Sequence, residues 1–135
     1  MSSRDSLEVN KALIRRVYDE GYSRGDESVY AACYCDDFLH HDKTIHDVGK
    51  GAEAERLSML RFRDAVPDAR FEVVHQIAEG DRVVNQLRIT GNPVKPFPPI
   101  EPGAPMAFGA VAIFRIREGK IAEEWFYRAS GTSEA

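Results

Sequence analysis

The sequence predicts an α+β domain in which helices gather on one face of an antiparallel sheet. In the first half of the chain, apolar residues recur at steps of three and four, which is the period of amphipathic helices. In the second half, apolar and polar residues alternate between short turn signals, which is typical of strands joined by hairpins. Strands that follow one another without helices between them do not predict a parallel sheet with crossover helices.

Three helices are expected in the first half of the chain. The first covers about residues 6–23 and the second about 27–35. The third covers about 52–66 and ends before Pro67, because the residue before a proline is disfavoured in helical conformation. Residues 36–48 are polar and rich in histidine, and we expect them to form a loop.

Four strands are expected in the second half, over about residues 71–77, 82–90, 107–117 and 120–129. The segment 92–106 interrupts them and carries six of the seven prolines. Proline donates no hydrogen bond to a strand ladder, so this segment is predicted to be an irregular loop.

Length and charge restrict the class of protein. We expect a single domain over residues 1–135, with an ordered core over about 6–129 and a frayed tail at 130–135. Lys and Arg total 18 against 22 Asp and Glu, a net charge of -4, which predicts no nucleic-acid partner. The sequence has no signal peptide and no apolar run that could span a membrane, so a cytoplasmic location is expected.

Several short motifs occur in an order that resembles the SnoaL-like polyketide cyclase family. The resemblance covers about residues 8–129. It rests on NKALIRRVY at 10–18, SRGD at 23–26, FLHHD at 38–42, PDARF at 67–71, EGDRVV at 79–84, ITG at 89–91, FRIREGKI at 114–121 and EEW at 123–125.

The resemblance implies the nuclear transport factor 2-like fold, a cone in which a strongly curved sheet wraps around helices and leaves an apolar pocket at its open end. It also implies homodimers that form through the sheet, and a cyclase or isomerase that works by acid–base chemistry without a cofactor. The family usually has an aspartate four residues after the tryptophan and often a histidine directly before it. Here these positions hold Ala129 and Glu124.

Four residues are the candidates for catalysis. His41 aligns with a family histidine at the cavity mouth, and an imidazole can relay a proton near neutral pH. Asn85 lies among apolar residues of the second strand, where it could donate to a ligand oxygen or bond to a neighbouring side chain. Tyr127 and Glu123 share a predicted face with Trp125. Glu123 could act as a base if enclosed, or pair with Arg115 or Arg88.

The pocket is expected to be lined by apolar and aromatic side chains that suit a small apolar organic ligand. The same residues would equally fill a core. The candidates are Tyr18, Tyr34, Phe38, Met59, Phe62, Leu87, Phe108 and Trp125. Residues 92–106 are expected to form a semi-rigid flap over the cone mouth, with Phe97 and Ile100 pointing inward, or to pack against a dimer partner.

No metal or cofactor is expected. His40, His41, Asp42 and His46 could in principle hold a metal ion, but their spacing follows no fixed ligand register. Cys33 and Cys35 are interpreted as reduced, packed thiols. The preferred hypothesis is a cyclase or isomerase that acts on a polyketide- or steroid-like metabolite. The alternatives are a binding protein without catalysis, favoured by Ala129, and an interaction module that only dimerises.

Overall fold

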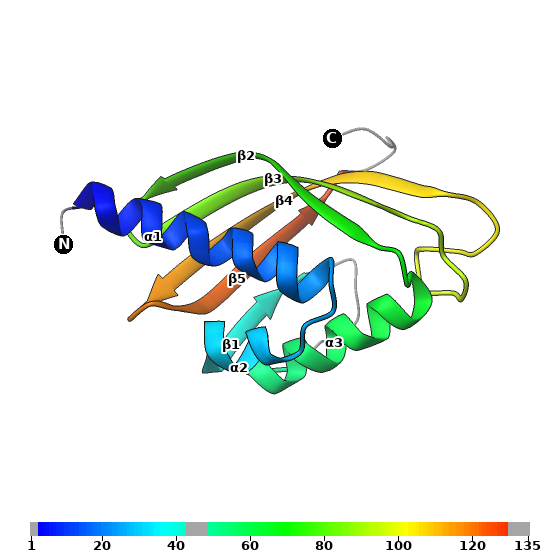
Figure 1. Cartoon of the computed structure of the whole chain (residues 1–135), viewed down its shortest axis with the longest axis horizontal. Coiled ribbons are helices and arrows are strands. Elements are labelled where there is room, and N and C mark those ends of the chain that lie inside the picture. Colours follow the sequence, from blue (N-terminus) through cyan, green and yellow to red (C-terminus); the bar gives the residue numbers. More distant parts are fainter. Residues whose placement is uncertain (1–2, 43–48, 130–135) are drawn as a thin grey trace.

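The computed structural model describes residues 3–42 and 49–129 (Figure 1). The helices are α1 (Ser3–Arg16), the π-helical turn η1 (Val17–Tyr22) that continues it, α2 (Ser28–Cys33) and α3 (Ala52–Ala65). The strands are β1 (Tyr34–His41), β2 (Arg70–Glu79), β3 (Arg82–Gly91), β4 (Met106–Arg117) and β5 (Lys120–Arg128).

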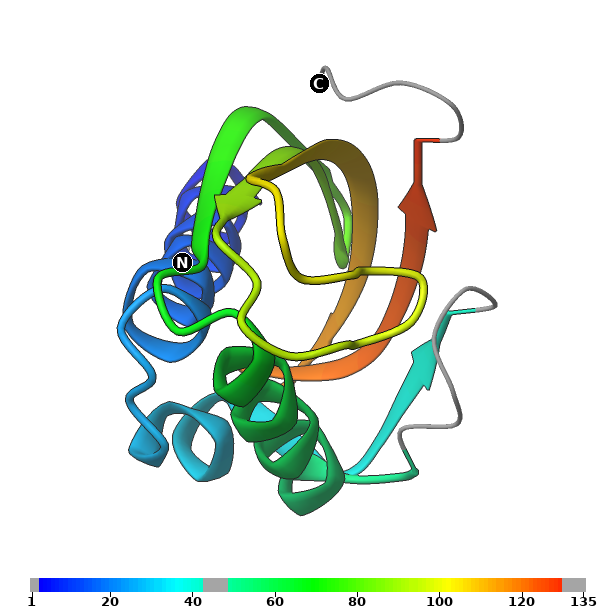
Figure 2. The same cartoon turned by 90° about the vertical axis from the view of Figure 1, so that its right-hand side faces the viewer.

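The five strands form one mixed sheet in the order β1-β5-β4-β3-β2. β2 to β5 are antiparallel neighbours, whereas β1 pairs with β5 in parallel. The sheet curls strongly, and the helices lie on its concave side (Figure 2). The predicted α+β class is therefore confirmed, with one strand more than the hairpin pattern indicated.

β1 was not predicted, because residues 36–48 were expected to form a loop. Residues Tyr34–His41 instead form a strand, and the second helix ends at Cys33. The polar residues Asp36 and Asp37 point to solvent, while Phe38 is buried. The partner of β1 is β5, more than 80 residues away along the chain, so no local pattern announces the pairing. Residues 43–48 of the expected loop lie outside the described part of the chain.

A bulge in β5 decides which of its side chains face the concave side. Arg115 of β4 pairs with Glu123 and the next residue, Ile116, pairs with Ile121, so Ala122 is an extra residue in β5. One extra residue reverses the alternation of faces. Simple alternation would place Ile121 and Glu124 on opposite faces of the strand, whereas the bulge allows both to be buried on the concave side.

Asn85 belongs to a buried hydrogen-bond network within the sheet. Its Oδ1 accepts from Nε2 of Gln76 at 3.0 Å, and its Nδ2 donates to the carbonyl oxygen of Ala112 at 3.3 Å. Gln76 Nε2 also donates to the carbonyl oxygen of Lys11, and Gln76 Oε1 accepts from Arg15. The network therefore connects α1 to the sheet, which was the structural alternative for this asparagine.

The proline-rich segment crosses the open end of the curved sheet (Figure 2). Two hydrogen bonds between the main chains of Phe97 and Ile100, at 2.8 and 2.7 Å, form a tight turn. The Val94 N–H donates to the carbonyl oxygen of Ala65 at 2.7 Å, and the Phe97 ring packs against Phe62 at 5.4 Å between centroids. These contacts place the segment as a flap that is fastened to α3.

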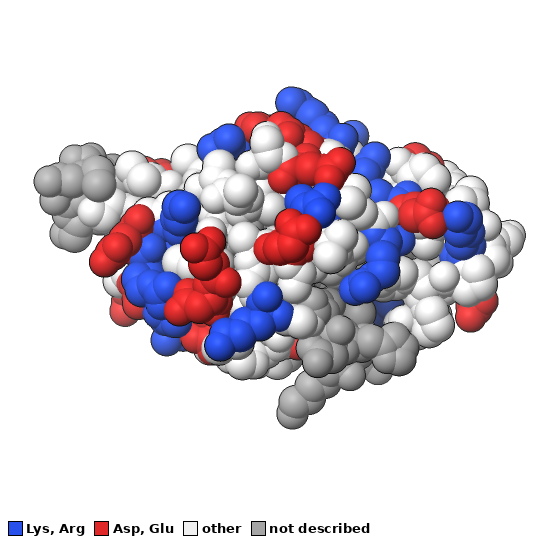
Figure 3. Space-filling model, turned by 90° about the horizontal axis from the view of Figure 1, so that it is seen from below, with Lys and Arg blue, Asp and Glu red and all other residues white. Residues whose placement is uncertain are grey.

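The outer surface mixes charges and apolar side chains. Lys and Arg alternate with Asp and Glu on the face seen in Figure 3. On the outer side of the sheet, Val111 pairs with Tyr127 and both are exposed. Dimerisation through this face stays a prediction. Among the described residues, no helix is both long and apolar enough to cross a membrane.

The Asn85 network leads to a stability prediction. We expect Asn85→Ala to lower the free energy of unfolding by about 1–3 kcal/mol, because the amides and carbonyl that it leaves behind stay buried without partners. Urea denaturation monitored by circular dichroism measures this change. The neighbouring Gln86→Ala, on the opposite face of β3, is the control and should shift stability by no more than about 0.5 kcal/mol. Equal stability of both variants would refute the network's role.

Candidate active site

The site begins where α3 is fastened to β1. The Gly51 N–H donates to the carbonyl oxygen of Phe38 at 2.7 Å, and the carbonyl oxygen of Gly51 accepts from the Glu55 N–H at 3.2 Å. Gly51 has φ of 95°, and a Cβ there would lie 2.5 Å from the carbonyl oxygen of Asp36. Only glycine allows this close approach. It sets the first turn of α3 against β1, so that Glu55 faces the inner side of the strand.

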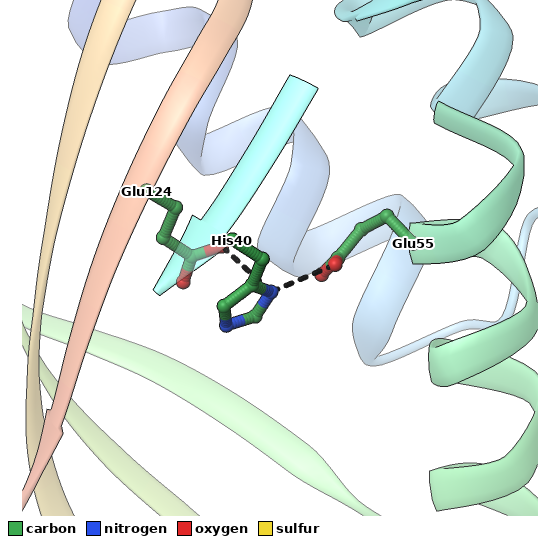
Figure 4. Close-up of side chains that lie close together, drawn as sticks. All are labelled: His40, Glu55 and Glu124. Carbon is green, nitrogen blue, oxygen red and sulfur yellow. Dashed lines mark hydrogen bonds and ion pairs between the residues drawn. The ribbon is translucent and has the colours of Figure 1, made fainter. Parts of the chain in front are cut away.

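His40, Glu55 and Glu124 meet inside the concave side, from β1, α3 and β5 respectively (Figure 4). Nδ1 of His40 lies 2.8 Å from Oε1 of Glu55, a hydrogen bond, and 3.7 Å from Oε1 of Glu124. The Tyr22 hydroxyl donates to the other oxygen of Glu55. The side chains of His40, Glu55 and Glu124 are 8%, 1% and 4% exposed, so all three groups are removed from bulk water.

The second ring nitrogen of His40, Nε2, points away from both carboxyl groups (Figure 4). It is buried, and it has no hydrogen-bond partner among the described residues. Leaving a buried polar atom unpaired costs about 1–3 kcal/mol, and such atoms in native proteins call for an explanation. Glu124 Oε1 is likewise buried without a hydrogen-bond partner among the described residues, so Nε2 and this oxygen are the two atoms of the cluster that are positioned to meet a ligand.

A mostly apolar cavity of about 70 Å³ adjoins the cluster. Its aromatic and aliphatic walls come from the helices, the sheet and the proline-rich flap, while its polar groups gather along β1, α3 and β5. The lining residues are Tyr18, Tyr22, His40, Asp42, Glu55, Ser58, Phe62, Phe71, Ile89, Phe97, Pro99, Ile100, Phe108, Glu124, Phe126 and Arg128.

Burial keeps both glutamates protonated at neutral pH. Loss of hydration raises the pKa of Glu55 to about 8. The pKa of Glu124 is raised well above its usual value, first by burial and then by the charges of Glu55 and Asp42. Two carboxyl groups that share an apolar site do not both ionise, and the pair titrates as a coupled unit.

Burial also keeps the His40 imidazole neutral. Loss of hydration lowers its pKa to about 4, with Asp42 opposing and His41 adding to this shift. A protonated Glu55 donates its proton toward Nδ1, so the ring carries its own hydrogen on Nε2. The cluster can therefore present an N–H to a ligand oxygen and replace that proton from Glu55.

The same three side chains offer one nitrogen and two oxygens to a cation, and these donor atoms lie within 4.8 Å of one another. This set differs from the metal set considered from the sequence. His41 points out of the cavity, and His46 lies outside the described residues. Cys33 and Cys35 are buried free thiols.

The structure brings His41 and Glu123 together, but outside the cavity lining. Nε2 of His41 lies 2.6 Å from Glu123 Oε2, and the imidazole stacks on Trp125 at 5.3 Å between ring centroids. Glu123 also accepts from Arg115 at 3.1 Å. Burial opposes but does not outweigh these two hydrogen bonds, which lower the pKa of Glu123. The arginine pairing is thus the alternative that the structure shows.

The other predicted residues divide between cavity, core and surface. Tyr127 is 57% exposed on the outer face, and Asn85 is fully buried in its own network. Of the eight predicted lining residues, Tyr18, Phe62 and Phe108 line the cavity. The remaining five do not line it: Tyr34, Phe38, Met59 and Leu87 are core residues, and Trp125 lies on the outer face.

Sequence reasoning missed Glu55 and considered His40 only as a possible metal ligand, although the sequence carries a signal for each. Glu55 precedes Met59 by four residues and Phe62 by seven, so helical periodicity places its carboxyl on the buried stripe of α3. His40 follows Phe38 by two, and alternation in a strand puts both on one face. Glu124 stands at the position before the tryptophan that the family resemblance had already marked.

Comparisons with known proteins agree with the fold. The family model for SnoaL-like polyketide cyclases matches residues 12–129. A comparison with curated proteins finds no match. Among solved structures, TsrD from Streptomyces laurentii superposes with a TM-score of 0.79 at 23% identity, covering 90% of this chain and 88% of that one.

Two further structures have the same fold. A protein of Jannaschia sp. CCS1 described as SnoaL-like polyketide cyclase gives a TM-score of 0.78 at 24% identity, covering 90% and 86% of the two chains. A protein of Catenulispora acidiphila with a ketosteroid isomerase-like fold, in complex with trimethylamine, gives 0.76 at 13% identity, covering 90% and 88%. The family match spans most of the chain, and the chain belongs to the SnoaL-like polyketide cyclase family.

Proposed function

We propose that the protein is a cofactor-independent enzyme of the cyclase or isomerase type. It would move a proton next to a carbonyl group of a small apolar, polyketide- or steroid-like metabolite. The observation that carries this proposal is the buried His40–Glu55 pair at the wall of an apolar cavity. Nε2 of His40 has no hydrogen-bond partner there among the described residues. A pure binding site would need one orienting polar group, whereas here several titratable groups converge.

His40 is the proposed acid. In the neutral cluster Nε2–H donates a hydrogen bond to the ligand's carbonyl oxygen, where negative charge develops as a neighbouring carbon loses its proton. As the oxygen takes the proton from Nε2, Nδ1 receives the proton of Glu55. Glu55 acts through His40 and is a positioning and relay residue. Its second oxygen is held by the Tyr22 hydroxyl, which fixes the carboxyl orientation.

Asp42 is the proposed base. It follows His40 by two residues and lines the same cavity. The family carboxylate expected after the tryptophan is absent at Ala129, and Asp42 would supply a carboxylate from the neighbouring strand end instead. In the proposed step the carbon-bound proton passes to Asp42 and the oxygen receives the proton from His40, which gives an enol. The enol carbon can then attack a second carbonyl of the same molecule or be reprotonated elsewhere, and nothing is oxidised or reduced.

The adjacent histidines of β1 provide a matched test. We expect His40→Gln to slow proton exchange next to a carbonyl by about 10²- to 10⁴-fold, since the variant loses the acid. His41→Gln should change the rate no more than about twofold, because that ring lies outside the cavity lining. The measurement follows deuterium incorporation into 2-tetralone, a flat apolar ketone, in D₂O by NMR, with the rate in buffer alone subtracted.

Circular dichroism must show both variants folded. A large loss in His41→Gln with none in His40→Gln would restore the sequence-based assignment and refute the one made from the cavity. Activity that chelation abolishes and a divalent cation restores would replace the proton relay by metal chemistry at the same three side chains.

The raised pKa of Glu55 predicts the alkaline limb of the pH profile. The relay needs Glu55 protonated, so the exchange rate should fall as pH rises through about 8. In Glu55→Gln, the rate should be lower and this limb should vanish, because an amide does not titrate. A limb that persists unchanged in Glu55→Gln would show that another group controls it.

A further inference from the structure

Arg128 stands at the other end of the cavity from the acid pair. Beyond the bulge in β5, the side chains of Glu124, Phe126 and Arg128 all line the cavity. Arg128 follows Glu124 by four residues, a span of about 13 Å at roughly 3.3 Å per residue. Along this strand the cavity wall therefore runs from the Glu124 carboxyl past the Phe126 ring to the Arg128 guanidinium, and the charge of Asp42 acts on both Glu124 and Arg128.

The guanidinium of Arg128 is not committed to a partner in the fold. Its central carbon lies 4.0 Å from the centroid of the Phe108 ring, and it has no hydrogen bond or ion pair with any described residue. Burial lowers its pKa, and the negative charge of Asp42 only partly opposes this shift. None of its five N–H donors has a partner among the described residues, so all of them are available to an acceptor on a ligand.

Other partly buried arginines of this chain differ in that respect. Arg56 binds Glu53 and Glu27, and Arg115 binds Glu123. Arg63 donates to the main-chain carbonyl oxygens of Tyr22, Ser23 and Pro67. These three arginines are bound to groups of the protein itself, whereas Arg128 lines the cavity and has no such bond with the described residues.

We propose that Arg128 binds a carboxylate at the outer end of the ligand, so that the substrate is an apolar carboxylic acid and not its neutral ester or amide. The planar fork of a guanidinium matches a carboxylate with two parallel hydrogen bonds. Phe108 fixes the plane of that fork by stacking. The apolar body of the ligand would lie between the aromatic walls, with its ketone toward Nε2 of His40. This specificity rests on the cavity being the ligand site under the proposed function.

Binding of two probes of nearly equal shape tests the charge requirement. 2-Naphthoate and 2-naphthamide share a flat apolar body and differ in the charge of the head group. Titration calorimetry at neutral pH should give a Kd for naphthoate at least about tenfold lower than for naphthamide. Arg128→Gln should weaken naphthoate about 10- to 100-fold and leave naphthamide within about threefold, as expected for loss of a charge-assisted hydrogen bond.

Two variants separate charge and geometry from general damage. Arg128→Lys keeps the charge but not the fork, so its Kd for naphthoate should be intermediate. Arg88→Gln removes an exposed arginine from the outer side of the sheet and should bind as the original chain does. Equal Kd values for the two probes, or an unchanged Kd for naphthoate in folded Arg128→Gln, would overturn the proposal, as would failure of both probes to bind at millimolar concentration.

The outcome is independent of catalysis, because no probe is turned over. If the two probes bind equally while exchange of 2-tetralone still depends on His40, the acid–base function is supported and the role of Arg128 in binding a carboxylate is refuted. If naphthoate is preferred while His40→Gln leaves the exchange rate of 2-tetralone unchanged, the cavity is a carboxylate-binding site and the proposed acid–base chemistry is refuted.

Discussion

The parallel pairing of β1 with β5 is the constraint on which the site depends. In its register His40 lies opposite Glu124 and His41 opposite Trp125. The first pair faces the concave side and the second pair the outer side. A slip of β1 by one residue would turn His41 instead of His40 toward the concave side and would remove the buried pair of His40 and Glu124. The hydrogen bond from Gly51 to Phe38 fixes α3 against the same strand and adds Glu55 from the opposite wall.

This arrangement costs stability at neutral pH. The pKa of Glu55 is about 4.5 in the unfolded chain and about 8 in the folded protein. Its favourable contribution to stability is thus complete below about pH 4.5 and is lost as pH rises through about 8. The pKa of His40 shifts in the opposite direction, so its contribution is present above about pH 6.5 and is lost as pH falls through about 4. The fold therefore accepts the cost of Glu55 at neutral pH and that of His40 in acid, as is typical of sites whose groups are held ready for proton transfer.

Local pattern predicted the helices, four of the strands and the proline-rich flap, because each depends on neighbouring residues or on turn chemistry. It failed where distant segments meet. β1 forms a strand only because the edge of β5 is free to pair with it. The bulge at Ala122 turns Trp125 and Tyr127 to the face of the sheet opposite to the one that simple alternation from Ile121 predicts. These two features place His40 and Glu124, and not their neighbours His41 and Glu123, at the wall of the cavity. The family resemblance drew attention to His41 on the first of these strands and to the position of Glu124 on the second.

The proposed mechanism depends on a neutral His40 imidazole that carries its proton on Nε2 and is backed by a protonated Glu55. Nitrogen-15 NMR of the histidine rings, titrated from pH 3 to 9 and assigned with His40→Gln and His41→Gln, measures this state directly. We expect the His40 ring to stay neutral and in the Nε2–H form at pH 6–7, and to become charged only near pH 4. A His40 ring that titrates near 6.5, or that carries its proton on Nδ1 at neutral pH, would contradict it.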